Sequence, residues 1–403
     1  MPTLNCHQGI ATIRPVRLSR RPIIIHIIVG LNVGGAELML FRLLKDASSK
    51  TNAFEHQVVS LTSLGELGPK LMAMGIPVYA LELRGLVNIF SIFIKLVHLL
   101  RQINPSTVQT WMYHSDLIGG LAARTAGISN VVWNIRNTLI PQGRWSRSQF
   151  IIRLCAWLSK WIPRRIVCCA EAGRFNHIKM GYAIEKMTVI PNGYDLELFN
   201  NAFDSRDDVR NKFGFNGNCI VIGIVGRFDE LKDYGNFISA AKIVSKHKSQ
   251  VRFLMIGRGI ESTNVRLMSL LVNTGFIERF MLLGERDDTA NLMAAMDIYC
   301  LSSRAEGFPN VVAEAMAVRL PCVVTDVGDA ALIVQDSGYV VPPQNSSALA
   351  NALICMSDLS SDQRRDFGNR ARELIERRYA IGAIVDMYTN LYLSLDVKLT
   401  KNE

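Results

Sequence analysis

The sequence predicts an α/β protein with two Rossmann-like domains, each containing a parallel sheet, that face each other across a cleft. Three observations support this prediction. Short apolar runs alternate with segments of helical periodicity in both halves of the chain. The alternation restarts after residues 190–195, which are rich in turn formers. Finally, 403 residues with 49% hydrophobic and 20% charged side chains can form more than one packed core.

In the first half, an apolar run at residues 22–30 precedes a glycine-rich turn and a segment of helical periodicity at 36–46. Such short runs are typical of strands buried on both faces of a parallel sheet. We expect further strands at 56–61, 77–81, 107–111 and 130–134, and further helices at 90–102 and 117–127. This order predicts a first domain over residues 22–192. We expect residues 1–21 to be a disordered leader. They are not expected to be a signal peptide, because the apolar run after their cations is short and no cleavage site follows it.

The second half repeats the alternation from a new start. We expect strands at 219–225, 251–256, 280–283, 298–301 and 322–325. We expect helices at 234–246, from Pro309 onward, at 346–356 and at 362–378. This order predicts a second domain over residues 193–380. Residues 381–403 are expected to form a helix and tail that pack back on the first domain.

Charge is unevenly distributed along the chain. Residues 1–200 contain 22 Lys and Arg against 10 Asp and Glu, whereas the remaining residues contain 23 against 25. The basic half favours an acidic or membrane-borne partner. We expect no nucleic acid as partner, because no recognised binding module is present. The eight cysteines form no C-x-x-C pair and no metal-ligand spacing, which favours a reducing, cytoplasmic compartment.

One segment, residues 143–165, combines tryptophans with six Lys and Arg. On a helix, five of its apolar side chains would fall along one side: Phe150, Leu154, Trp157, Leu158 and Trp161. A basic amphipathic helix with tryptophans is typical of binding to an anionic bilayer surface, here the inner face of a membrane. The alternative is an ordinary helix that packs its apolar side on the sheet. No apolar run reaches the ~20 residues needed to cross a bilayer.

The most informative stretch, residues 302–317, carries two carboxylates, Glu306 and Glu314, after the expected strand at 298–301. Pro309 suits a first helical turn, and the free amides of a helix start attract anions such as phosphate. Carboxylates accept hydrogen bonds from sugar or ribose hydroxyls. The pattern therefore predicts a site for a nucleotide-sugar. The alternative is that Glu306 is a solvated loop residue and Glu314 an exposed helix residue.

Two cations, Arg227 and Lys232, follow the expected strand at 219–225 and precede a helix. Placed in the cleft, they would stabilise the negative charge that grows on a departing diphosphate. No D-x-D motif occurs, so the usual acidic clamp for a cation is missing. We therefore expect neither a metal nor another cofactor. The alternative is that both side chains are ordinary surface cations.

A known family contains the same motifs in the same order. They are Gly34-Gly35-Ala36-Glu37, Pro191-Asn192-Gly193, Val225-Gly226-Arg227-x4-Lys232 and Glu306-x7-Glu314. Through this ordered set the chain resembles glycosyltransferase family 4, retaining enzymes of the GT-B fold, over roughly residues 22 to 395. The resemblance implies that the first domain binds the acceptor and the second domain binds the nucleotide-sugar donor.

The resemblance also implies residue roles. Arg227 and Lys232 would contact the donor diphosphate, Glu306 the hydroxyls of the donor sugar, and Glu314 the ribose. The segment from Gly307 through Phe308 to Asn310 and Val311 would cradle sugar or phosphate oxygens with its amides. Many family members have Gly-Leu where this chain has Pro309-Asn310, and the proline removes one amide donor.

Three further groups complete the expected site. His114 matches a family histidine near the anomeric centre, although it could simply be a satisfied helix-start residue. Gly34 and Gly35 would let the backbone approach a phosphate, or would only form a tight turn. The loop containing Gly284, Glu285 and Arg286 is expected to bind the base.

By resemblance, the chain transfers a sugar from a nucleoside-diphosphate sugar to a hydroxyl of a lipid-linked or glycan acceptor, in cell-surface polysaccharide, lipopolysaccharide or glycolipid synthesis. Retaining members lack a clear nucleophile, so front-face attack is expected, and Asp116 is read as a helix-start acid. Two alternatives stay open: a nucleotide-sugar epimerase of the same fold, and a non-catalytic sugar-nucleotide-binding protein at a membrane.

Overall fold

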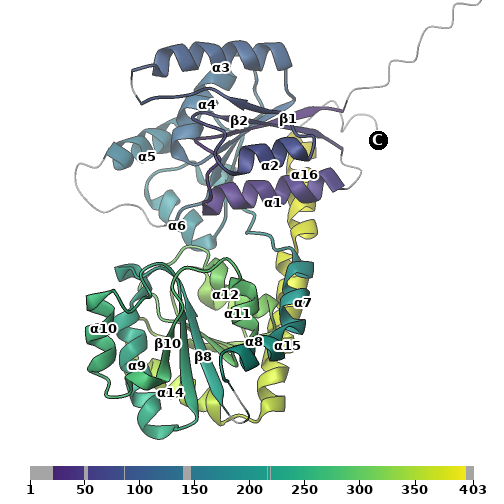
Figure 1. Cartoon of the computed structure of the whole chain (residues 1–403). Coiled ribbons are helices and arrows are strands. Elements are labelled where there is room, and N and C mark those ends of the chain that lie inside the picture. Colours follow the sequence, from purple (N-terminus) through teal and green to yellow (C-terminus); the bar gives the residue numbers. More distant parts are fainter. Residues whose placement is uncertain are drawn as a thin grey trace, which may run out of the picture.

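The structure, a computed structural model, describes residues 21–49, 53–85, 87–138, 147–215, 217 and 219–395. Two α/β domains lie one above the other, and each has a parallel sheet between two layers of helices (Figure 1). The predicted fold class is confirmed. Most of the expected leader, residues 1–20, and the end of the expected tail, residues 396–403, lie outside the described residues.

The N-terminal domain contains a seven-stranded parallel sheet of order β3-β2-β1-β4-β5-β6-β7. Its strands are β1 (Ile23–Ile28), β2 (Glu55–Ser60), β3 (Val78–Ala80), β4 (Thr107–Trp111), β5 (Val131–Ile135), β6 (Arg165–Cys168) and β7 (Met187–Val189). Its helices are α1 (Gly35–Ser49), α2 (Leu67–Ala73), α3 (Ile89–Ile103), α4 (Tyr113–Thr125), α5 (Arg147–Leu158) and α6 (Glu171–Lys179), with a 3-10 turn η1 (Ile184–Lys186). Helices α3, α4 and α5 pack on one face of the sheet, and α1 and α2 pack on the other.

The C-terminal domain contains a six-stranded parallel sheet of order β10-β9-β8-β11-β12-β13. Its strands are β8 (Ile220–Val225), β9 (Val251–Ile256), β10 (Phe280–Leu282), β11 (Ile298–Leu301), β12 (Cys322–Thr325) and β13 (Gly338–Val341). Helices α7 (Leu196–Asp204), α12 (Asn310–Ala317), α13 (Ala330–Val334) and α15 (Ser361–Tyr379) contribute to the core on one face. Helices α9 (Tyr234–His247), α10 (Val265–Val272) and α14 (Ser346–Asp358) cover the other. The remaining helices are α8 (Arg206–Lys212), α11 (Thr289–Ala294), η2 (Glu230–Lys232) and η3 (Ile277–Arg279).

Both sheets have a topological switch point, where the chain starts in the middle and builds the two sides in turn. It lies between β1 and β4 in the first sheet and between β8 and β11 in the second. Ligands of open parallel sheets bind beyond the carboxyl ends of the strands at such points. The topology alone therefore favours the loops after β8 and β11 as a binding site.

The chain crosses between the domains twice. It leaves the first domain after β7, and it returns through helix α16 (Ile381–Leu395), drawn in yellow in Figure 1. The two crossovers lie side by side, because the Tyr194 amide donates to the Tyr379 carbonyl and the Ile381 amide donates to the Tyr194 carbonyl, both at 2.9 Å. Tyr388 and Tyr392 of α16 are buried in the core that α1 and α2 form on the first sheet.

Three local predictions were wrong. Helix α4 begins at Tyr113 rather than 117, so His114 lies inside its first turn rather than before the helix. Helix α12 begins at Asn310, with Pro309 as its N-terminal cap residue. Strands β6, β7 and β13, each of three or four residues, were missed. No helix of the described part is long and apolar enough to cross a bilayer.

Candidate active site

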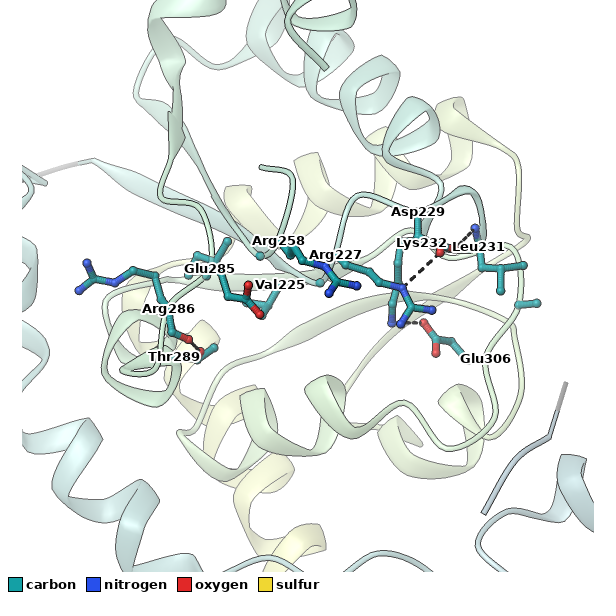
Figure 2. Close-up of a pocket in the computed structure, with 14 residues that line it drawn as sticks. Val225, Arg227, Asp229, Leu231, Lys232, Arg258, Glu285, Arg286, Thr289 and Glu306 are labelled. Atoms are coloured by element: carbon teal, nitrogen blue, oxygen red, sulfur yellow. Dashed lines mark hydrogen bonds and ion pairs between the residues drawn. The ribbon is translucent and has the colours of Figure 1, made fainter. Parts of the chain in front are cut away.

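A pocket of about 520 Å³ opens at the switch point of the C-terminal sheet (Figure 2). Its lining includes five charged residues predicted from the sequence: Arg227, Lys232, Glu285, Arg286 and Glu306. The cations follow β8, Glu306 follows β11, and the base-loop residues follow β10. Since neighbouring parallel strands end at the same edge of a sheet, side chains that are far apart in sequence meet here.

Lys232 and Glu306 are held to each other in the pocket. The Lys232 Nζ lies 2.7 Å from Glu306 Oε1, and the Ser303 hydroxyl donates to the same oxygen at 2.6 Å. Lys232 ends the short helix η2, which Asp229 caps by accepting a hydrogen bond from the Leu231 amide. Both side chains are largely buried, with 22% and 13% of their surface exposed, so this ion pair is weakly screened by water. Incoming sugar hydroxyls and phosphates would meet one fixed cation and one fixed carboxylate.

Arg227 is more accessible than Lys232. Its side chain is 58% exposed, and its Nε lies 3.2 Å from the Asp229 carboxylate. The hydrogen bond from the Leu231 amide and the Arg227 guanidinium both lower the pKa of Asp229. The guanidinium therefore stays tethered by one ion pair while most of its donors remain free for a ligand.

The expected base-binding loop lies at the other end of the pocket. Gly284 has a φ of +65°, which favours glycine at this turn. Its carbonyl accepts from the Gly257 amide at 2.7 Å, which ties the loop to the end of β9. Arg286 is paired with Asp288 at 2.7 Å, and Figure 2 shows its side chain extending away from Arg227.

Glu314, the expected ribose ligand, does not line this pocket. It faces the N-terminal domain, where Arg42 of α1 lies 3.7 Å from its Oε1. Burial raises the pKa of Glu314, and the Arg42 charge opposes that rise. Asn310 is likewise engaged between the domains, because its Oδ1 accepts from the Asn192 amide group and the Tyr194 hydroxyl, each at 2.7 Å. The first turn of α12 is thus anchored to the interdomain crossover.

The loop that carries Glu306 is supported from both domains. A Cβ atom on Gly307 would lie 2.4 Å from the Thr138 Oγ1 of the N-terminal domain, and one on Gly328 would lie 2.3 Å from the Gly307 carbonyl oxygen. Close contact on both sides explains why these two positions are glycine. The neighbouring Asp329 carboxylate accepts from the amides of Glu171 and Ala172 at 2.8 and 2.9 Å. It thereby caps helix α6 of the other domain.

The expected residues of the N-terminal domain do not reach the pocket. Gly34 and Gly35 lie where α1 begins, and neither has a positive φ, so the turn does not demand glycine for its backbone angles. His114 is exposed in the first turn of α4, at the carboxyl edge of β4. Asp116 is buried and accepts a hydrogen bond from the Thr110 hydroxyl at 2.5 Å; burial raises its pKa to about 7. Asp116 therefore faces the interior.

Among the cations that line the pocket, one was missed by sequence analysis. Arg258 follows β9 as Arg227 follows β8, and the two strands end in the same four-residue pattern, Ile224-Val225-Gly226-Arg227 and Met255-Ile256-Gly257-Arg258. This repeated pattern of two apolar residues followed by glycine and arginine could have identified Arg258 from the sequence.

The described part of the chain brings no three His, Cys, Asp or Glu side chains together as candidate metal ligands.

On the outer surface of the first domain, α5 and the turn that follows it present an apolar and basic face. Phe150, Trp157 and Trp161 are 70%, 58% and 56% exposed, and the two indoles meet edge to face at 4.7 Å. The opposite side of the helix, with Ile152 and Cys155, packs on the sheet. The packed side agrees with the alternative of an ordinary domain helix, and the membrane interpretation of the exposed side stays a prediction. Residues 143–146 lie outside the described part.

Two family models match the sequence. The model described as Glycosyltransferase Family 4 matches residues 33–198, and the model described as Glycosyl transferases group 1 matches residues 219–358. The first match covers most of the N-terminal domain, and the second covers the pocket described above. Together they span about three quarters of the chain.

Curated relatives and solved structures agree with these matches. An Escherichia coli UDP-Gal:alpha-D-GlcNAc-diphosphoundecaprenol alpha-1,3-galactosyltransferase is 26% identical over 317 residues, which cover 77% of this chain and 81% of the relative. The putative glycosyltransferase EpsF of Bacillus subtilis is 26% identical over 314 residues, covering 75% and 79%. The crystal structure of Anabaena Alr3699/HepE in complex with UDP superposes with a TM-score of 0.79 at 22% identity, covering 92% of this chain and 99% of that one.

Proposed function

The chain belongs to glycosyltransferase family 4, and on that premise we propose that it is a retaining transferase that moves a sugar from a nucleoside-diphosphate sugar to a lipid-linked or glycan acceptor. One observation carries the proposal: Arg227, Lys232 and Glu306 line a single pocket at the switch point of the C-terminal sheet. Two cations beside one carboxylate match a substrate with a diphosphate at one end and hydroxyls at the other.

The reaction that this geometry supports needs little from the protein beyond charge and position. The bond between the anomeric carbon and the diphosphate oxygen breaks, and the acceptor oxygen attacks from the same face. The acceptor hydroxyl passes its proton to the departing diphosphate. Lys232 and Arg227 stabilise the negative charge that grows on that diphosphate, while Glu306 orients the sugar by accepting from its hydroxyls.

The relatives suggest the first substrates to test. The name of the Escherichia coli relative specifies UDP-galactose as donor and a diphosphoundecaprenol-linked sugar as acceptor, and Alr3699/HepE was crystallised with UDP. We therefore propose a UDP-sugar donor and a polyprenyl-diphosphate-linked acceptor in cell-surface polysaccharide or glycolipid synthesis. Purified protein would be incubated with a panel of UDP-sugars, with and without this acceptor.

The expected result is a glycosylated lipid formed only when donor and acceptor are both present, with the anomeric configuration of the donor retained. A product that consists of epimerised donor, formed without acceptor, would establish the epimerase instead. Binding of donors without turnover, across a full range of lipid and glycan acceptors, would favour the non-catalytic alternative.

The proposal includes independence from divalent metal. Lys232, Arg227 and the start of α12 place positive charge at the carboxyl edge of the C-terminal sheet. We expect EDTA to change the initial rate by less than about twofold, because these groups can stabilise the diphosphate without a cation. Loss of activity with EDTA that manganese restores would contradict this expectation.

We also propose that the exposed face of α5 binds the anionic inner surface of a membrane, at the cytoplasmic side. Residues 147–165 contain five Lys and Arg and no Asp or Glu, and the exposed Phe150, Trp157 and Trp161 occupy the same segment. Tryptophans insert at the level of the lipid headgroups while cations attract anionic lipid. This surface would hold the enzyme at the bilayer that carries a lipid-linked acceptor.

Changing both Trp157 and Trp161 to alanine should weaken binding to vesicles containing phosphatidylglycerol by about tenfold or more, since each indole loses the free energy of its burial. Co-sedimentation would measure the change. Val265→Ala, at an 81% exposed position of the other domain, is the control. Equal binding of wild type to phosphatidylcholine vesicles and to anionic vesicles would contradict the role of the cations.

A further inference from the structure

Arg258 and Arg227 are forced together by the pairing of their strands. The register of β8 and β9 pairs Val225 with Ile256, so Gly226 and Gly257 come next, and the two arginines follow. The pairing continues past the strand ends, because the Gly226 amide donates to the Ile256 carbonyl at 2.9 Å and the Phe228 amide to the Arg258 carbonyl at 2.8 Å. Neighbouring strands lie about 4.8 Å apart, so the two backbones cannot separate here.

The glycines make this approach tighter still. A Cβ atom on Gly257 would lie 2.0 Å from the Gly226 carbonyl oxygen. Both arginines line the same pocket, and Figure 2 shows the Arg258 side chain extending toward Arg227. The paired backbones therefore place the starting points of both arginine side chains side by side at the pocket wall.

The two guanidinium groups differ in their partners. Arg227 pairs with Asp229, Lys232 with Glu306 and Arg286 with Asp288. Arg258 has no ion pair or side-chain hydrogen bond to any residue in the described ranges, although it is exposed at the pocket wall. Among the cations that line the pocket, Arg258 is thus the one that forms no ion pair with a carboxylate of the described residues. Neighbouring like charges repel, and an anion bound between them adds two attractive interactions that outweigh the repulsion.

We propose that Arg258 is a second arginine for the donor diphosphate, binding the same leaving group as Arg227 from the neighbouring strand. This inference rests on the proposed donor site and adds a residue to it. The bound group is a diphosphate because the proposed donor carries one, and each of two guanidinium groups on adjacent strands can engage one of its two phosphates in a bidentate way.

The test compares Arg258→Ala with wild type by isothermal titration calorimetry, using five nucleoside diphosphates (UDP, GDP, ADP, CDP and dTDP) and the matching monophosphates. We expect Arg258→Ala to weaken the preferred diphosphate by about tenfold or more, as for loss of a charge-assisted hydrogen bond, and its monophosphate far less. Arg258→Lys should restore part of the affinity, since a point charge remains. Arg266→Ala, at an exposed arginine of α10 away from this pocket, is the control.

The outcomes distinguish the role of Arg258 from the existence of the proposed donor site. An equal loss for diphosphate and monophosphate, or no loss for either, would overturn the assignment of Arg258 while leaving the donor site intact. Failure of the wild type to bind any of the five diphosphates would overturn the proposed function itself. A thermal unfolding midpoint of Arg258→Ala equal to that of wild type would verify that a weakened affinity does not come from unfolding.

Discussion

Replacing Lys232 by alanine is expected to lower kcat by about a hundredfold to a thousandfold, as for removal of one preorganised donor to a developing anion. The Nζ of Lys232 lies 2.7 Å from Glu306 Oε1 and the side chain is 22% exposed, so its charge acts in a poorly hydrated part of the pocket. Its effect should appear in kcat more than in KM, because the charge on the diphosphate is larger in the transition state than in the bound donor.

The interpretation of that loss needs three comparisons. Lys232→Arg keeps the charge and should retain part of the activity. Glu306→Gln removes the carboxylate that pairs with Lys232 but leaves the ammonium in place. Because Glu306 is assigned to the hydroxyls of the sugar, the loss of activity in Glu306→Gln should vary with the identity of the donor sugar. Lys246→Ala, at an exposed lysine of α9, should have wild-type rates. If Lys232→Ala keeps wild-type kcat with full donor occupancy, the assigned role on the leaving group is wrong.

The residues predicted for the site lie together where strand order alone brings them together, and apart where their positions depend on how the domains meet. Arg227, Lys232 and Glu306 each follow a strand of the same parallel sheet, so the alternation of strands and helices already brings them to one edge. Glu314 lies on α12, and its partner Arg42 comes from α1 of the other domain. No local pattern encodes that pairing, because it depends on the relative placement of two separately folded sheets.

The missed elements have a similar physical origin. Strand β6 is held in the sheet by pairing with β5, and β7 by pairing with β6, so both depend on neighbours distant in the sequence more than on a pattern of their own. The cap that Asp329 supplies to α6 joins residues 158 positions apart in the sequence. Arg258 is different, because the repeated glycine-arginine pattern after two paired strands was visible in the sequence.

Gly257→Ala should destabilise the C-terminal domain by about 3 kcal/mol or more, through backbone strain together with overpacking. Its φ is +141°, which side chains rarely adopt, and its new Cβ would collide with the Gly226 carbonyl oxygen at 2.0 Å. Both obstacles are backbone, so no side chain can move to relieve them. Separating the ends of β8 and β9 would also move Arg227 and Arg258 apart, so donor binding should weaken at temperatures where the domain remains folded.

Two probes can locate this destabilisation within the molecule. All five tryptophans precede residue 193, so tryptophan fluorescence reports unfolding of the N-terminal domain, whereas circular dichroism reports both domains. We expect Gly257→Ala to shift the dichroism transition to lower urea and the fluorescence transition much less. Gly275→Ala is the matched control, because its φ is +77° but no atom lies within 4 Å of the added Cβ. It should cost only about 1 to 2 kcal/mol of left-handed strain. Equal effects of the two substitutions would mean that the contact between Gly226 and Gly257 contributes nothing beyond the backbone angle.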